Sequence, residues 1–357
     1  MRTRCWLGRM MRGLLWALVF GWSVAQAEPV CVVVDGHPGG ASFSDAVEST
    51  GRIWMESAGR ARCRAIRVGL GQGGPGAAVA GASQKERLKA ALEGLESPSE
   101  DPLWLVLSGH GNAQGKEARF NLEGEDLGVG ELKVWLAKIR RPMVVVLGFS
   151  SSGAFVKGVC GPDRIVVSAT RSGEEENWSR FSRAFATALT EESSDGNGDG
   201  QVSIFEAWWA ALDRVEAFYK ESGRIQTEHA VLEDLGAGRP AGREAFDVMG
   251  NWKGRGSAKE REVGLLARRS FWIASSLEAV LTREEREKRS SLEERLIEWK
   301  ARKTGMERGE YERGLEGLLV DLAEVYAGAK GRLKGGGDAG EGRQPARSRP
   351  VKEAGGK

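Results

Sequence analysis

Two short apolar runs of the chain each end near a residue that could take part in catalysis. The first run, residues 103–107, is followed by His110, and the second, residues 143–147, is followed by Ser150. Apolar runs of this length, bounded by glycine and small polar residues, are typical of buried parallel strands. Active residues of open α/β sheets lie just beyond the carboxyl ends of such strands. The pattern therefore predicts a histidine base beside a hydroxyl nucleophile.

Ser150 is a weak nucleophile unless a base is held close to its proton. A serine hydroxyl depends on that contact, whereas a cysteine is already partly ionised near neutral pH. No Gly-x-Ser-x-Gly motif surrounds Ser150, and the acidic residues available to orient His110 are Asp35, Glu123 and Glu125. The alternative interpretation, which we favour, is an inert serine–glycine turn beside an unused histidine.

A twelve-residue acidic segment matches the calcium-binding loop of an EF-hand at every key position. The expected ligands are Asp195, Asn197, Asp199, Gln201 through its carbonyl, Ser203 directly or through water, and Glu206 with two oxygens. Hard oxygen ligands suit Ca²⁺. The sequence holds no second loop of this kind, so we expect one structural site of modest affinity. The alternative is an acidic helix–loop–helix connector that holds no metal.

Alternating strands and helices position these residues. The order of elements predicts an α/β fold with a mostly parallel sheet sandwiched by helices. The predicted strands are 30–35, 64–68, 103–107, 143–147 and 164–169, and the predicted helices are 44–58, 83–95, 130–139, 179–190 and 204–222.

The two strand ends resemble those of the caspase–legumain (clan CD) cysteine peptidases. His110 and the glycine after it match the catalytic His-Gly pair of that family, and residues 152–153 match the end of its Cys-x-Ser-Gly motif. This alignment puts Ser150 in the cysteine position and Gly148 where many members have Asp or Glu. The resemblance spans roughly residues 29–235 and implies the α/β fold of the family. Serine in place of cysteine implies a member without peptidase activity.

Five segments follow one another along the chain. They are a signal peptide (1–27), the caspase/legumain-like α/β domain (28–190), the EF-hand-like loop with its following helix (191–238), an all-α C-terminal region (239–327) and a disordered basic, glycine-rich tail (328–357). In the C-terminal region, a capping box at Ser291 predicts a helix over 291–303, and a second helix is expected over 310–327.

The first 27 residues have the composition of a signal peptide. Four arginines precede the apolar stretch 14–24, and Ala25-Gln26-Ala27 is a small-x-small cleavage site. We expect export to the periplasm or the medium after cleavage near Ala27, with no transmembrane span in the mature chain; an uncleaved anchor is the alternative. Loss of the four arginines changes the net charge from +2 to −2, and neither value indicates a nucleic-acid partner.

Three cysteines remain after this cleavage. Cys31 and Cys63 open strands that should be neighbours, so a disulfide between them is compatible with an oxidising compartment. Free thiols are the alternative. Cys160 lies in a glycine–proline loop, where we expect a structural or free thiol.

These features predict an exported calcium-binding protein whose caspase/legumain-like domain is catalytically inactive and acts by binding or scaffolding. The expected partner is a protein or peptide of unknown identity, and the oligomeric state stays open. The alternative is an active, peptidase-like hydrolase that uses His110 and Ser150.

Overall fold

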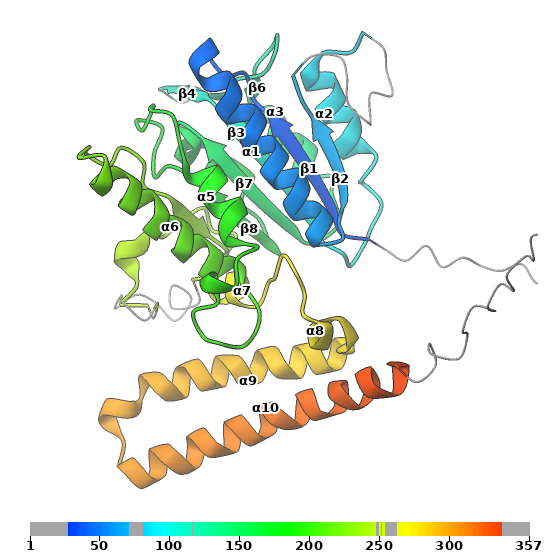
Figure 1. The fold of residues 1–357 in the computed structure, drawn as a ribbon, viewed down its shortest axis with the longest axis vertical. Helices are drawn as coiled ribbons and strands as arrows, with labels where there is room; N and C mark the ends of the chain where they lie inside the picture. Colours follow the sequence, from blue (N-terminus) through cyan, green and yellow to red (C-terminus); the bar gives the residue numbers. More distant parts are fainter. Residues whose placement is uncertain are drawn as a thin grey trace, which may run out of the picture.

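The computed structural model of the chain is centred on a six-stranded sheet (Figure 1). In spatial order the strands are β2 Arg64–Val68, β1 Val30–Asp35, β3 Leu103–Gly109, β7 Met143–Phe149, β8 Arg164–Ser168 and β9 Val231–Glu233. All neighbours pair in parallel except β9, which pairs with β8 in the antiparallel direction. Every residue of β1, β3, β7 and β8 is buried, which explains why these strands are continuous apolar runs.

The structure describes residues 28–70, 81–115, 117–247, 250, 252–253 and 263–337. The predicted signal peptide and residues 338–357 of the predicted tail lie outside these ranges. Within them, no helix combines the length and the apolar character that crossing a membrane requires.

Helices cover both faces of the sheet. One face carries α1 Ala41–Arg60, α5 Phe181–Ala188 and α6 Ile204–Glu221, and the other carries α2 Gln84–Glu93, α3 Val129–Leu136 and α4 Val156–Val159. Successive side chains of a strand point to opposite faces, so Val33 packs in the first layer and Val32 in the second. The predicted α/β fold with a mostly parallel sheet is confirmed.

A small antiparallel sheet follows β3 directly. Its strands are β4 Gly111–Gln114, β5 Glu117–Phe120 and β6 Leu127–Gly128. His110 is the one residue between β3 and β4, so both sheets fix its backbone. The sequence indicates only a short extended segment over 118–122, which overlaps β5, because strands of two to four residues are too short for an alternating pattern to reveal a sheet.

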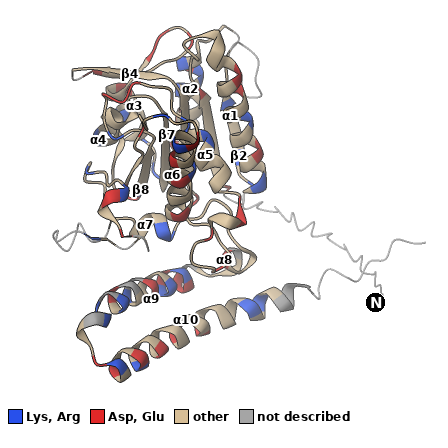
Figure 2. Ribbon diagram, turned by 60° about the vertical axis from the view of Figure 1, so that its left-hand side comes forward, with Lys and Arg blue, Asp and Glu red and all other residues tan. Residues whose placement is uncertain are grey.

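The C-terminal region is helical, as predicted. Its helices are α7 Leu265–Arg268, α8 Ser276–Val280, α9 Arg283–Ala301 and α10 Arg308–Gly337. Helices α9 and α10 form a long hairpin on one side of the α/β domain (Figure 1), and both carry acidic and basic residues (Figure 2). Short 3₁₀ turns occur at η1 Ser152–Phe155, η2 Glu192–Ser194, η3 Arg243–Ala245 and η5 Lys303–Gly305.

Both long C-terminal helices exceed their predicted bounds. Helix α9 begins after Thr282, whose side chain forms a capping box with Glu285, and not at the later serine box. Helix α10 continues to Gly337, so the predicted disordered tail begins with ten helical residues. The extension is stabilised because Ala329 is buried against the hairpin and Arg332 pairs with Glu285.

The segment 191–238 packs as part of the α/β domain. Its strand β9 completes the main sheet, and its helix α6 packs in the same apolar layer as α1 and α5. A three-residue strand such as β9 leaves too short a pattern to be recognised in the sequence.

Candidate functional site

His110 and Ser150 meet at the carboxyl edge of the sheet, as the sequence predicts. Strands β3 and β7 are neighbours whose last residues, Gly109 and Phe149, lie opposite each other. The residues that follow are therefore side by side. Nδ1 of His110 lies 3.3 Å from Oγ of Ser150, which is a loose hydrogen-bonding distance.

The Ser150 hydroxyl is already satisfied by the backbone. Ser150 has no exposed surface. Its Oγ donates to the carbonyl of Gly111 at 3.0 Å and accepts from the amide of the same residue at 3.1 Å. A hydroxyl has one proton to donate. Donation to Gly111 therefore leaves no proton on Ser150 for His110 to accept.

Aromatic rings surround the His110 ring. Its ring centroid lies 5.1 Å from that of Phe43 and 4.8 Å from that of Trp178, both edge-on. Phe43 and Trp178 stack on each other at 4.9 Å. Burial lowers the pKa of His110 from 6.5, and the nearby charge of His37 adds to this effect. The ring is therefore neutral at pH 7 and is able to accept a proton.

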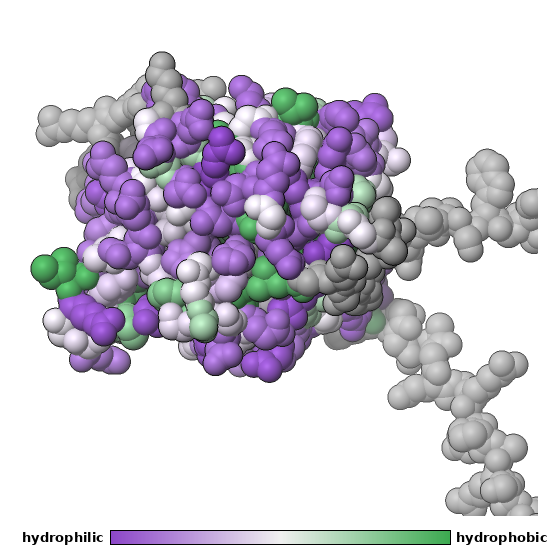
Figure 3. All heavy atoms as spheres, turned by 90° about the horizontal axis from the view of Figure 1, so that it is seen from above, coloured by the Kyte–Doolittle hydropathy of each residue, from purple (hydrophilic) through white to green (hydrophobic). Residues whose placement is uncertain are grey.

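The surface above this edge is mostly hydrophilic (Figure 3). Hydrophobic residues on the face in view are scattered and do not gather in one patch. Phe43 and Trp178 are only partly exposed. A partner at this edge would therefore meet polar groups around a small aromatic centre.

None of the three acidic candidates bonds the His110 ring in the described part of the chain. Asp35 accepts from Nε of Arg67 at 2.6 Å. Burial raises the pKa of Asp35 to about 6 although Arg67 opposes the shift. Glu125 pairs with Lys85 at 3.0 Å, and the backbone amide of Glu123 donates to Gln84.

The turn after Ser150 is held by hydroxyl contacts and by a backbone hydrogen bond. Ser151 adopts the left-handed region with φ of 60°, and its amide donates to the carbonyl of Glu175. Oγ of Ser152 lies 2.9 Å from that of Ser168 and 3.1 Å from Oγ1 of Thr170. These contacts fix the turn without using Ser150.

Gly148 is glycine because the fold leaves no room for a side chain. A Cβ at this position would collide with the side chain of Ser182 in α5. The acidic residue that the resembled family often has here is therefore excluded by packing.

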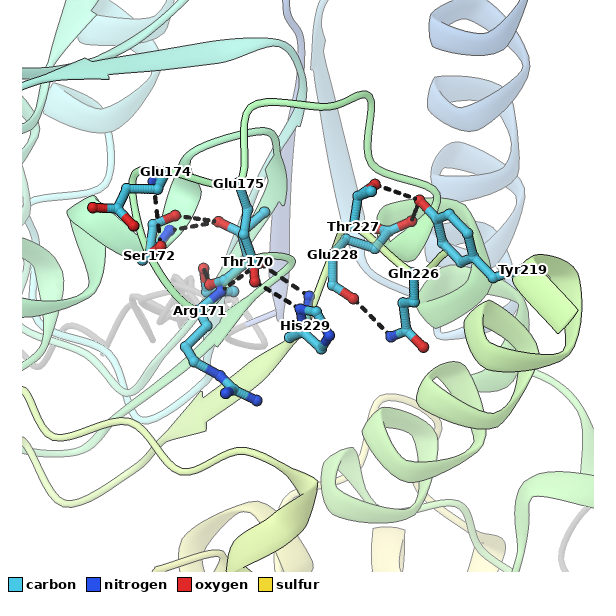
Figure 4. A network of polar contacts seen from close by, with 12 residues as sticks. Thr170, Arg171, Ser172, Glu174, Glu175, Tyr219, Gln226, Thr227, Glu228 and His229 are labelled. Atoms are coloured by element: carbon cyan, nitrogen blue, oxygen red, sulfur yellow. Dashed lines mark hydrogen bonds and ion pairs between the residues drawn. The ribbon is translucent and has the colours of Figure 1, made fainter. Parts of the chain in front are cut away.

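Glu175 links the serine turn to the segment that leads into β9 (Figure 4). Its carboxylate accepts from the backbone amides of Arg171 and His229 and lies 2.7 Å from Nδ1 of His229. The sequence analysis did not identify Glu175, because its partners are remote in sequence. Nearby, Glu228 accepts from the Ser179 hydroxyl at 2.7 Å and from the first amides of α5.

The cysteines are free thiols, so the disulfide that the sequence allows is not formed. Cys31 is fully buried in the sheet, and burial raises its pKa well above its usual range. Burial also raises the pKa of Cys63 to about 12 and that of Cys160 by a smaller amount. Thiols with such raised pKa values are poor nucleophiles at neutral pH.

The predicted calcium loop has the expected backbone shape. Gly200 has a φ of 84°, the left-handed conformation that the sharp turn requires. Asp195 accepts from the amides of Gly198 and Gly200 at 2.7 and 2.8 Å. Asn197 Oδ1 accepts from the Asp199 amide at 2.8 Å. The first three predicted ligands thus bond the loop's own amides.

The last predicted ligands lie at the start of α6. The carboxylate of Glu206 accepts from the Asn197 amide at 3.2 Å and from the Ser203 hydroxyl at 2.7 Å. Glu206 therefore reaches back across the loop. Nowhere among the described residues do three His, Cys, Asp or Glu side chains already converge as metal ligands. The residue types and the loop backbone fit Ca²⁺, and binding would require the carboxylates to turn inward from these amides.

No protein-family model matches the sequence, and no curated protein is significantly similar to it. The chain is similar to the Drosophila initiator caspase Dronc, with 13% identity, a TM-score of 0.37 and coverage of 59% of this chain and 80% of that chain. Caspase-1 from Spodoptera frugiperda is 9% identical, with a TM-score of 0.39 and coverage of 58% of this chain and 86% of that chain. A protein from Geobacter sulfurreducens is 15% identical, with a TM-score of 0.36 and coverage of 52% of this chain and 89% of that chain. Functional assignment therefore rests on the geometry of the chain itself.

Proposed function

We propose that this is an exported calcium-binding protein whose caspase/legumain-like α/β domain is catalytically silent and acts in binding or scaffolding. The observation that carries the proposal is the bonding of Ser150, whose buried hydroxyl both donates to and accepts from the backbone of Gly111.

Three features of the His110 site support a silent centre. The hydroxyl proton of Ser150 points to a carbonyl, the amide of Gly111 is occupied by the same hydroxyl, and no carboxylate in the described part of the chain orients the His110 ring. Acyl transfer by serine needs a base aligned on that proton and free amides for the developing oxyanion. A thiolate is less demanding, so the serine removes the group that could tolerate this geometry.

A fluorophosphonate probe tests the silent centre directly. We expect no labelling of the folded protein, with a Ser150→Ala variant giving the same background. Labelling of wild type that disappears in both Ser150→Ala and His110→Ala would overturn the proposal.

A hydrolase is the second candidate, because Nδ1 of a neutral His110 lies within 3.3 Å of Ser150. Rotation of the hydroxyl away from Gly111 would align the pair. A Ser150→Cys variant distinguishes a site that lacks only its nucleophile from a surface used for binding alone. Iodoacetamide-sensitive peptidase activity in that variant would mean that only the nucleophile has been lost, whereas an inactive but folded variant supports a surface used for binding alone.

We propose a protein or peptide as the partner, bound at the polar edge around Phe43 and Trp178. Their partly exposed rings offer contact area next to His110. A Phe43→Ala, Trp178→Ala double variant should lose partner capture in a crosslinking experiment with the exported protein, while Val134→Ala, on an exposed face of α3, should retain it.

Calcium at the loop Asp195–Glu206 is proposed from the ligand order and from the left-handed Gly200. A chelator should lower the melting temperature of the wild type but not that of an Asp195→Ala, Glu206→Ala variant. An unchanged wild-type melt would contradict the calcium site.

Export predicts that the amino terminus of the secreted protein begins at Glu28, which Edman sequencing would check.

A further inference from the structure

The chain after α7 lies against the second half of the calcium loop. The amide of Ile204 donates to the carbonyl of Ser270 at 2.9 Å, and Ser203 forms an isolated antiparallel bridge with Phe271. The amide of Ser275 donates to the side-chain oxygen of Gln201 at 3.0 Å. Residues 270–275, here called the strap, therefore pair with the calcium loop. They take the place of a second calcium loop, which the sequence does not contain.

The strap is also anchored in the core of the α/β domain. Trp272 is buried, and its ring contacts those of Trp54 and Trp104 at 6.2 and 4.3 Å between centroids. Its Nε1 donates to the hydroxyl of Ser57 at 2.6 Å. The last strap residue, Ser275, is the N-cap of α8. The strap therefore joins the loop and the core to α8, the short helix that precedes the hairpin.

A second contact joins α9 to the loop through charge. Arg289 is 2% exposed, pairs with Glu278 and lies 3.6 Å from Glu293. Its guanidinium carbon lies 5.7 Å from the centroid of the Phe271 ring. Burial raises the pKa of Asp199 and the charge of Arg289 opposes this shift, whereas the charge of Asp199 adds to the burial that raises the pKa of Glu278 and Glu293. One buried cation and two carboxylates therefore lie within electrostatic range of the acidic loop.

Among the residues that the structure describes, the hairpin has no apolar cluster in common with the α/β domain. Its buried apolar residues form a cluster of their own, comprising Leu281, Leu292, Leu318, Val325 and Ala329. In Figure 1 the loop between α5 and α6 projects toward α9. Docking of the hairpin therefore depends on the strap and on the charged contact at Arg289.

We propose that calcium in the loop Asp195–Glu206 tightens the docking of helix α8 and of the α9–α10 hairpin. The strap is the partner of the single loop, and Arg289 is the cation at the contact. The inference rests on the proposed calcium site. Without the ion, the charge of Asp199 repels those of Glu278 and Glu293, and the buried Arg289 offsets this repulsion together with Arg286 and Arg269. The two positive charges of a bound calcium ion replace this repulsion with attraction between the loop and the two carboxylates.

The coupling is reciprocal. A hairpin that docks more tightly when calcium is bound must raise calcium affinity by the same factor. Loosening the strap or removing Arg289 is therefore expected to weaken calcium binding although neither supplies a predicted ligand.

Hydrogen exchange of the full-length protein, with and without calcium, tests the inference. Amides of the loop report binding of the ion, and amides of α8 and α9 report docking. We expect calcium to slow exchange in both regions, by about fivefold or more in the hairpin, since coupling of this kind is typically worth that factor. Slower exchange in the loop with an unchanged hairpin would overturn the coupling and leave the calcium site standing. Unchanged exchange in both would overturn the calcium assignment and this inference with it.

Variants that leave every predicted ligand oxygen in place provide the second test. Gln201→Ala removes the side-chain acceptor of the Ser275 amide but keeps the backbone carbonyl of residue 201, which is the predicted ligand. Arg289→Gln removes the buried charge, and Arg308→Gln is its matched control because it breaks only an exposed pair with Glu312. We expect calcium affinity, measured by titration calorimetry, to fall about fivefold in the first two and to stay unchanged in the control. Full affinity in folded Gln201→Ala would overturn the inference even if Arg289→Gln fails to fold.

Discussion

The serine turn and the calcium loop satisfy their polar atoms in opposite ways. Ser150 is neutral and fully buried, and its hydroxyl bonds both polar groups of a single residue, Gly111. The calcium loop carries charged oxygens near solvent, and Asp195 bonds amides of Gly198 and Gly200 that belong to the loop itself. The hydrogen bonds of Ser150 stabilise a single structure, whereas the oxygens of the calcium loop can exchange their amide partners for another ligand.

This contrast explains why the two regions differ as functional candidates. Moving the buried hydroxyl of Ser150 would leave its backbone partners unpaired, and this costs free energy. The hydroxyl is therefore fixed in its present position. Exposed carboxylates that release loop amides lose little, because water replaces the bond. Reactivity would require the serine turn to break contacts, whereas calcium binding would only redirect oxygens that are already in the loop.

The largest expected effect comes from restoring an acid to the serine turn. Gly148→Asp places a Cβ against Ser182 and buries a carboxylate without a partner. We expect the free energy of unfolding to fall by about 4 kcal/mol or more, from overpacking and an uncompensated charge. Gly130→Asp is the control, since this exposed glycine in the first turn of α3 has open space around it. Urea unfolding measures both, and equal stability of the two variants would contradict the packing argument.

Asp35 lies on the same sheet edge as His110, and it makes a second, pH-dependent test. Burial raises its folded pKa from 3.8 to about 6 against the opposing charge of Arg67. Its contribution to stability is therefore full below about pH 4 and is lost as the pH rises through 6. The loss should approach about 3 kcal/mol, since each pKa unit corresponds to about 1.4 kcal/mol.

An Asp35→Asn variant cannot ionise, so this decline should vanish from it. Urea unfolding of both proteins between pH 4 and 7 checks the expectation. Parallel profiles would mean that Asp35 does not titrate as its burial requires.

The elements that set both regions could be predicted because their signals are local. The apolar runs that become β3 and β7, and the twelve residues from Asp195 to Glu206, are contiguous in sequence. The meeting of His110 and Ser150 follows from parallel strands alone, because neighbouring carboxyl ends share one edge.

The remainder depends on contacts between remote residues. Nothing near Ser150 reveals that Gly111 satisfies its hydroxyl, or that Trp178 and Phe43 flank His110. The strap is equally hidden, since Trp272 reaches the core through Trp104, far away in sequence. The predicted start of helix α9 is too late, because Ser291 in the middle of the helix has the residue spacing of a capping box.

Truncation of the buried hydroxyl should have the third largest effect. Ser150→Ala leaves both the amide and the carbonyl of Gly111 without their partner in a buried place. We expect a loss of about 2 kcal/mol in the free energy of unfolding, the usual cost of such unpaired groups. Ser193→Ala, at an exposed serine, should stay within about 0.5 kcal/mol of wild type. A neutral Ser150→Ala would mean that the turn can readily release its hydroxyl, which would favour the hydrolase.

The smallest effect should come from the calcium loop when the ion is absent. Asn197→Ala removes the exposed bond from its side chain to the Asp199 amide. In chelator we expect a loss of about 0.5 kcal/mol in the free energy of unfolding, because water takes over the freed amide. With calcium present the same variant should lose more, since a predicted ligand of the ion is gone and binding to the folded state contributes to stability. Urea unfolding with and without calcium separates the two losses, and Ser150→Ala supplies the internal reference because its cost should not depend on calcium. An equal cost for Asn197→Ala in both buffers would mean that the loop, like the serine turn, is fixed by its own hydrogen bonds and does not exchange them for an ion.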